Sequence, residues 1–289
     1  MKKLPYVFLV LLLAVAAIVA CSRTQKTDKT TSAQLRTHKE AVDTLRGSEE
    51  AQAAQPAQPL EIIPENNSEV LASNDLSALF HRTEEYDEPA VYNGFYGTDH
   101  YRIEMYFASV TKDATHPNVY HIEGKSRYKR NITPFHGEIV LEEAVQFRDP
   151  NISEANMKEM EIKNTYMTHG TFKLQEDSTF TGSGVFSGKV AIDFATKTNN
   201  GIRQWYFSET KEGAQGAGFI FDGKWVSYKT GKSKPITWAR DIFMIADGIL
   251  KDFSIGERDV EINPKYRKLG WDNFWENDEW WNENPSAKL

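Results

Sequence analysis

The chain has almost no cysteine, because Cys21 is the only one among its 289 residues. No disulfide can therefore form within the chain, and no set of thiolates is present to hold a metal ion. A folded domain built from this sequence must be stabilised by an ordinary hydrophobic core. If a modification occupies the one thiol, cysteine catalysis is excluded as well.

Aromatic residues are missing from residues 22–79, which are rich in Thr, Ala, Gln, Glu and Lys and contain Pro56, Pro59 and Pro64. A segment of this composition buries too little apolar surface to offset the entropy of ordering. We therefore predict a disordered tether over residues 21–85. As a flexible coil of this length, it would span on the order of 40 Å.

Positive charge is also scarce, with 34 Lys and Arg residues against 41 Asp and Glu residues. An acidic chain of this kind has no electrostatic reason to bind nucleic acid, and we expect none as a partner.

Sequence signatures of enzymes are absent too. Neither a His-Glu-x-x-His zinc helix nor a Gly-x-Ser-x-Gly nucleophile elbow occurs. Gly231-Lys232-Ser233 matches the end of a phosphate-binding loop, but Val226 occupies the position of the required first glycine, so a hairpin turn is favoured. We assign no catalytic residue, no metal ligand and no cofactor other than a lipid.

Three weaker alternatives stay open. Histidines in or beside predicted strands would bind a metal only if they converged in space: His100, His121, His136 and His169. Glu138 and Glu142 share a strand face but lie about 13 Å apart by strand rise, so a glycan hydrolase would need a carboxylate from another strand. A basic stretch is either a solvated strand face or a contact for an anionic envelope component: Lys125, Arg127, Lys129 and Arg130.

Residues 1–20 have the layout of a secretory signal, with Lys2 and Lys3 followed by an almost unbroken apolar run. The run ends in Ile18-Val19-Ala20-Cys21, which resembles the lipobox of bacterial lipoproteins. The resemblance implies cleavage before Cys21 and attachment of lipid to its thiol, which would anchor the protein in a membrane. An uncleaved signal anchor is the alternative, although the run is slightly short of the roughly 20 residues that cross a bilayer.

Ser22 follows the cysteine, where retention in the inner membrane would more often require Asp. The same resemblance therefore favours the outer membrane of a bacterial envelope as the location.

From residue 86 to residue 240 aromatic residues become frequent and strand-like alternation begins. Ile103, Met105 and Phe107, for example, share one face of a predicted strand. Further short apolar segments, separated by Gly, Asn, Asp and Pro, occur at 119–122, 137–145, 170–174, 184–194, 202–208, 218–221, 224–228 and 235–238. This spacing predicts a mainly β fold, an antiparallel barrel or sandwich, and the lack of alternating helices argues against a parallel sheet.

Several of these strands share a glycine pattern, in Tyr92-Asn93-Gly94-Phe95-Tyr96-Gly97, in Tyr120-His121-Ile122-Glu123-Gly124 and in Gly223-Lys224-Trp225. In this the chain resembles uncharacterised exported bacterial domains with a calycin-like β-barrel. The resemblance implies a fold and an envelope setting, and it brings no catalytic residues with it. The chain departs from the pattern in an insertion at 149–166 and in everything after Arg240.

Residues 241–289 have a different character. Apolar residues on one side of a 3.6-residue period favour a helix near 242–253, although Asp247-Gly248 is also a hairpin signal. Four of the seven tryptophans follow within 271–281. In a helical extension, Trp271, Phe274, Trp275 and Trp281 would form an aromatic stripe that docks on the chain's own barrel. As a second interpretation, the tail contacts an envelope protein through these four residues and Trp280.

The sequence thus predicts a lipid-anchored envelope protein that acts as a non-enzymatic binding or assembly module, through its β domain, its tail or both. A carrier of small apolar ligands and a glycan hydrolase with paired carboxylates are the alternatives.

Overall fold

The computed structural model describes residues 60–63, 69–80, 91–208, 211–256, 260–276 and 278–284. It comprises two units, Ala54–Asp272 with Trp280–Leu289, and Met1–Ala53 with Asn273–Glu279. The predicted signal, Cys21 and most of the predicted tether lie outside the described residues. No helix in the described ranges is long and apolar enough to cross a membrane.

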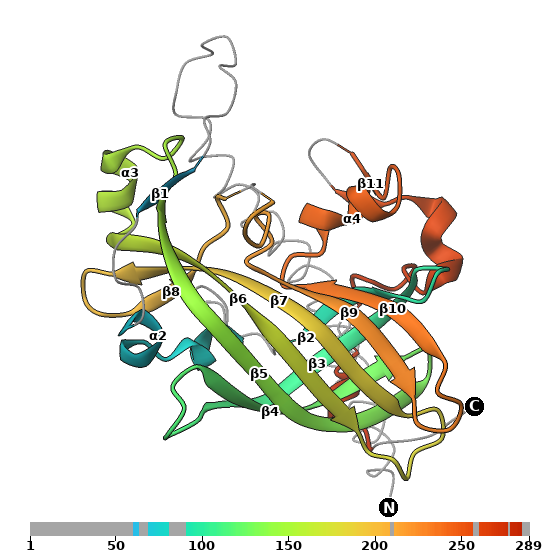
Figure 1. Cartoon of the computed structure of the whole chain (residues 1–289). Helices are drawn as coiled ribbons and strands as arrows, with labels where there is room; N and C mark the ends of the chain where they lie inside the picture. Colours follow the sequence, from blue (N-terminus) through green and yellow to red (C-terminus); the bar gives the residue numbers. More distant parts are fainter. Residues whose placement is uncertain are drawn as a thin grey trace, which may run out of the picture. The chain divides into compact units, whose positions relative to one another are not determined.

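A closed ring of antiparallel strands forms the larger unit (Figure 1). Its members are β2 (Val91–Tyr96), β3 (Tyr101–Lys112), β4 (Val119–Tyr128), β5 (Asn131–Arg148), β6 (Ile162–Glu176), β7 (Gly184–Lys197), β9 (Phe219–Ser227) and β10 (Ser233–Ala239). Each of these strands pairs with the next, and β10 pairs back with β2 from Ile236 and Tyr96 to Ala239 and Asn93. Closure gives every strand of the ring two neighbours, which confirms the mainly β antiparallel fold and shows that the barrel, of the two predicted architectures, is the one present.

The connections alternate between the two ends of the barrel. One end, which we call the hairpin end, carries the short turns at 97–100, 129–130, 177–183 and 228–232. The opposite end carries the longer connections at 113–118, 149–161 and 198–218, which include α3 (Glu154–Glu159) and β8 (Ile202–Gln204).

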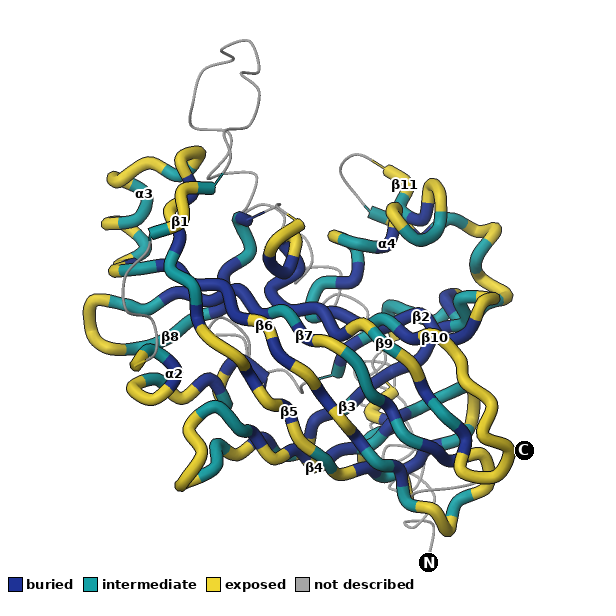
Figure 2. Tube along the Cα trace, in the orientation of Figure 1, coloured by how far each residue is buried: buried dark blue, intermediate teal, exposed yellow. Residues whose placement is uncertain are grey.

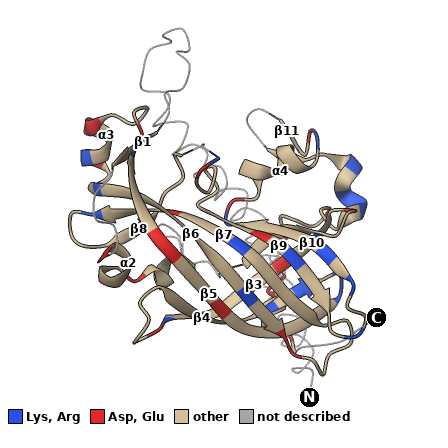
Figure 3. Cartoon of the chain, viewed as in Figure 1, with Lys and Arg blue, Asp and Glu red and all other residues tan. Residues whose placement is uncertain are grey.

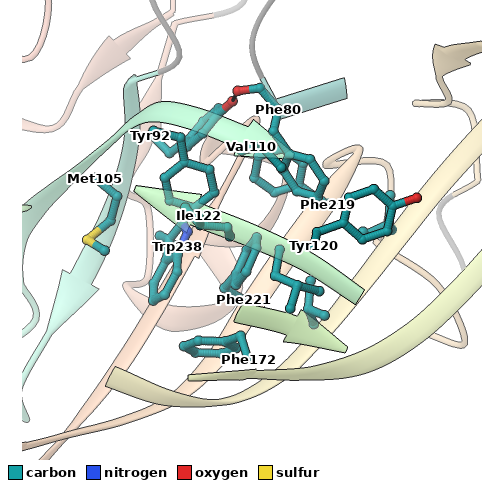
Figure 4. Packing of buried hydrophobic residues seen from close by; sticks show 14 of the residues in the cluster. Phe80, Tyr92, Met105, Val110, Tyr120, Ile122, Phe172, Phe219, Phe221 and Trp238 are labelled. Carbon is teal, nitrogen blue, oxygen red and sulfur yellow. Dashed lines mark hydrogen bonds between the residues drawn. The ribbon is translucent and has the colours of Figure 1, made fainter. Parts of the chain in front are cut away.

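Buried positions alternate with more exposed ones along the strands (Figure 2). The buried hydrophobic side chains pack together in the barrel interior (Figure 4). Phe221 stacks on Trp238 with ring centroids 4.7 Å apart, and Phe172 meets the same indole edge-on at 5.0 Å. Close strand approach leaves no room for side chains at some positions: a Cβ on Gly188 would lie 2.1 Å from the carbonyl oxygen of Asp222. Glycine at this point lets β7 and β9 bend around a small barrel.

Residues 69–80, which we call the plug, close the end opposite the hairpin end. They form α2 (Val70–Ser73) and η2 (Leu76–Phe80), and the plug's leucines and Phe80 belong to the main core. The ring of Phe80 lies 5.4 Å from that of Phe219. Lys112 holds the plug from outside, because its Nζ donates to the carbonyls of residues 71, 72 and 74 at 2.6, 3.0 and 2.8 Å.

The predicted disordered tether over residues 21–85 is too long, because the plug lies within this range and is folded. In addition, β1 (Glu61–Ile63) pairs with the far end of β5. The prediction used the lack of aromatic residues as the sign of disorder. Three leucines and Phe80 are nevertheless buried in the barrel core, and this burial holds the short segment in place. Residues 60–63 and 69–80 therefore belong to the fold.

The C-terminal extension is only partly helical. The helix predicted over the Asp247-Gly248 dipeptide is present as α4 (Phe243–Ile249), and β11 (Ser254–Ile255), β12 (Glu261–Ile262) and η3 (Pro264–Leu269) follow it. The helical stripe predicted across 271–281 is wrong, since residues 271–275 form turns and only η4 (Trp280–Asn282) is helical. Each tryptophan is instead placed by its own contacts.

Candidate functional site

The tail tryptophans of the larger unit pack on the outer face of β2, β3 and β4. Trp271 and Trp280 are 2% and 1% exposed. Trp271 lies between Phe95 and Phe253, at ring distances of 5.0 and 4.9 Å. The half-buried Trp281 stacks on Tyr106 at 5.7 Å.

These contacts agree with docking on the chain's own barrel. Phe274 and Trp275 belong to the smaller unit, where their rings meet edge-on at 4.7 Å. A contact between the tail and a partner protein stays a prediction, and two of its five proposed side chains, Trp271 and Trp280, have almost no exposed surface.

A buried ion network lies beneath the tail. Glu104 accepts hydrogen bonds from Nη2 of Arg102 at 2.9 Å and from Nε and Nη2 of Arg127 at 2.5 and 2.8 Å. The Arg127 guanidinium lies 5.0 Å from the Trp280 ring centroid, and Lys125 Nζ donates to the carbonyl of Trp281 at 2.6 Å. The interpretation of Lys125 and Arg127 as a solvated basic face is therefore wrong, and the tail is part of the fold.

Several aromatic rings converge at the hairpin end. Tyr96 is buried and lies 4.5 Å from Tyr128 and 5.7 Å from Trp225, measured between ring centroids. Tyr101 meets Tyr128 edge-on at 5.5 Å, and Tyr228 is 44% exposed. Strands β2, β3, β4 and β9 thus bring four aromatic side chains to one end of the barrel, and Tyr228 lies in the turn after β9.

Two lysines are held over these rings. Lys234 Nζ lies 4.8 Å from the Tyr96 centroid and 5.6 Å from that of Tyr128. Lys129 Nζ lies 4.9 Å from the Tyr101 centroid and 5.4 Å from that of Tyr128. Both lysines are exposed, so cation–π attraction orders their ammonium groups while leaving them open to solvent. We call these two lysines, with Tyr96, Tyr101 and Tyr128, the aromatic–lysine cluster; Tyr228 lies exposed in the turn that follows β9.

A buried carboxyl group, Glu176, lies beneath this cluster. It accepts hydrogen bonds from Ser126 Oγ at 2.6 Å, from the Gly184 amide at 2.8 Å and from Trp225 Nε1 at 2.9 Å. Burial raises the pKa of Glu176 above its ordinary value, and the three donors oppose this rise. Burial and then the Glu176 carboxylate raise the pKa of Tyr96. Through these hydrogen bonds Glu176 links β4, β7 and β9 directly below the cluster.

Charge is distributed unevenly between the two ends. The hairpin-end turns at 97–100, 129–130, 177–183 and 228–232 contain four Lys or Arg residues and two Asp residues, and Lys234 follows at the start of β10. Segment 149–161 at the opposite end has four acidic residues and one lysine. The hairpin end is thus locally basic on an acidic chain.

The other predicted chemical groups lie on the barrel wall. Glu138 and the exposed Glu142 lie on β5, and Glu138 pairs with His121 at 3.4 Å. His121 also contacts Asp113 at 2.8 Å, and this hydrogen bond, followed by backbone donors, lowers the pKa of Asp113. Within the described ranges, no three or more His, Cys, Asp and Glu side chains are grouped to hold a metal ion.

A second buried carboxyl group occurs on β7. The Ala214 amide donates to Asp193 Oδ2 at 2.9 Å, whereas Oδ1 is buried without a hydrogen-bond partner among the described residues. Gly213 packs directly on this oxygen, since a Cβ there would lie 2.4 Å away. Burial raises the pKa of Asp193 to about 7.

Comparison with protein-family models, curated proteins and solved structures yields no match. The sequence indicated Lys129 and Arg130 as a basic stretch and Trp225 in a glycine pattern, but it did not indicate that Tyr96 and Lys234 lie beside Tyr128 in space. Only the strand order brings them together.

Proposed function

We propose that this protein is a lipid-anchored, non-enzymatic binding module of the bacterial envelope that presents its hairpin end to a ligand. The anchor is Cys21, in the sequence that resembles a lipobox. The observation that carries the proposal is the contrast between the two barrel ends. One end is closed by the plug, and the other holds ordered, accessible rings and cations.

The packed interior argues against a carrier of small apolar ligands, because the space that such a ligand would need is filled by aromatic side chains (Figure 4). A glycan hydrolase is also disfavoured. Glu138 pairs with His121 on the outer wall, and Glu176 accepts three hydrogen bonds inside the barrel, so these two carboxyl groups do not face each other across a cleft.

The direction of the chain supports the choice of surface. The residues nearest the anchor, β1 and the plug, approach at the end opposite the hairpin end. The hairpin end is therefore the part of the barrel farthest from the point where the tether joins it.

Anchoring is tested by Cys21→Ser. We expect the variant to keep its signal and to incorporate no labelled palmitate, with wild type as the positive control. Normal processing and labelling of the variant would refute the anchor while leaving the binding surface untouched.

Binding is tested by a photo-crosslinking amino acid placed at Tyr228, at the hairpin end, and at Val140, which is 38% exposed on the wall. In intact envelopes we expect light-dependent adducts from position 228 that Lys129→Gln/Lys234→Gln weakens, and none from position 140. A third probe at Trp281 tests the tail-partner hypothesis. Equal adducts from positions 228 and 140, or adducts from position 281 alone, would contradict binding at the hairpin end.

A further inference from the structure

We propose that the hairpin end binds an acidic glycan, a linear sugar chain that carries carboxylate groups. This inference rests on the proposed function and adds the class of ligand. It is carried by the aromatic–lysine cluster, by the local excess of positive charge and by the hydroxyl groups around them.

The cations are positioned before any ligand arrives. Lys129 and Lys234 come from different hairpins, yet both lie over the ring of Tyr128, at 5.4 and 5.6 Å. A lysine on an open surface loses much side-chain entropy when it meets an anion. Because the rings already restrict these two side chains, that loss is smaller here than at an ordinary surface lysine.

The charge of the surrounding turns selects for an anion. Arg130, Lys229 and Lys232 add to the two ordered lysines, while Asp99 and Asp177 are the only acidic residues in the same turns. This basic end belongs to a chain in which acidic residues outnumber basic ones. A local field opposite in sign to the net charge attracts anionic ligands to one place on the surface.

Lysine predominates over arginine, at four of the five positions. An ammonium group is a point charge without the planar fork with which arginine grips a phosphate. Lysines therefore suit charges that are spread along a chain. This favours carboxylates on successive sugars over a single phosphate group.

The remaining side chains suit sugar rings. Tyr228 is exposed, so its flat apolar face and hydroxyl edge are accessible, whereas the rings of Tyr101 and Tyr128 are half-buried beneath the two lysines. The C–H face of a sugar packs on such rings, and its hydroxyl groups need neutral partners. The turns of the hairpin end and the start of β10 also carry exposed hydroxyl side chains: Thr98, Ser178, Thr179, Thr181, Thr230 and Ser233.

The test uses the full-length protein in detergent micelles and measures binding of oligogalacturonate at low salt. The variant is Lys129→Gln/Lys234→Gln, and the matched control is Lys189→Gln/Lys224→Gln, which removes two exposed lysines from the wall strands β7 and β9. We expect wild type and control to bind equally and the hairpin-end variant to bind roughly tenfold more weakly. Equal weakening of both variants would overturn the proposal, because it would show attraction by net charge alone.

Two further probes identify the ligand class. A neutral dextran oligomer of equal length should not bind, and inorganic polyphosphate should bind more weakly than oligogalacturonate. Tyr228→Ala should weaken only the sugar acid. Tighter binding of polyphosphate, or an unchanged affinity in Tyr228→Ala, would refute recognition of a glycan. If oligogalacturonate fails to bind while crosslinks at position 228 persist, the glycan class is wrong and the proposed function stands. If oligogalacturonate fails to bind and position 228 gives no crosslinks, both the glycan class and the proposed function are wrong.

Discussion

Asp193 should make the barrel less stable as the pH rises toward neutrality. Its carboxyl group is fully buried on β7, with one donor on Oδ2 and none among the described residues on Oδ1. The change that tests this is Asp193→Asn, which keeps the shape of the side chain and removes its ability to ionise.

The sign and size follow from proton linkage. Burial raises the pKa of Asp193 to about 7 in the folded protein, whereas an unfolded chain has an Asp pKa of about 3.9. Below about pH 4 the group is protonated in both states and costs nothing. Between about pH 4 and 7 the unfolded state releases its proton first, so wild type loses stability, by roughly 4 kcal/mol at about 1.4 kcal/mol per pKa unit. Above about pH 7 the loss is complete.

The assay is urea unfolding of both proteins from pH 4 to pH 8. The amide of the variant adds an offset that does not depend on pH, so the informative quantity is the change in the difference between the two proteins. We expect that difference to move in favour of the variant by up to about 4 kcal/mol across the range. Glu176 is present in both proteins and cancels.

The control for Asp193→Asn is Asp222→Asn, at an exposed carboxylate on the neighbouring strand β9. Its stability should run parallel to that of wild type across the same pH range. If Asp193→Asn also runs parallel to wild type, the carboxyl group is not held in a dry environment and the reasoning fails.

Three further changes probe how the fold is held. Trp280→Ala removes a fully buried indole and should lower the free energy of unfolding by about 3–5 kcal/mol, measured by thermal unfolding. A loss below about 1 kcal/mol would mean that the tail is not part of the fold. Gly188→Val places a Cβ 2.1 Å from the Asp222 carbonyl oxygen and should prevent folded protein from accumulating, whereas Gly248→Ala, with open space around it, should be tolerated. Lys112→Met removes three hydrogen bonds to the plug and should lower the stability by about 1–3 kcal/mol and speed proteolysis within residues 69–80; unchanged cleavage would argue against this role of the lysine.

The antiparallel strands could be predicted from sequence because alternation reports directly which side chains share a face. Ile103, Met105 and Phe107 are buried together in the core as the pattern required. Closure of the ring could not be predicted in this way, since a sandwich has the same alternation and differs only in whether β10 pairs with β2. The plug was missed because its burial depends on the open barrel end that receives it, which is not a property of residues 69–80 alone.

The candidate site shows a different limit. Lys129 and Lys234 are more than 100 positions apart, and their common neighbour, Tyr128, becomes visible only once the strand order is known. The tail illustrates the opposite case. Its tryptophans were conspicuous in sequence, but conspicuous aromatic residues are as often core as interface, and Trp280 is buried over Arg127.

The wall formed by β5, β6, β7 and β9 is a second candidate surface for a charged ligand. Its charges are mixed in sign (Figure 3). Glu138 lies opposite Lys173 on the neighbouring strand, and Lys189 lies opposite Asp222. Opposite charges at such cross-strand positions neutralise each other and favour a solvated face. The hairpin end has no comparable balance, so a ligand attracted by charge should be drawn there and not to the wall.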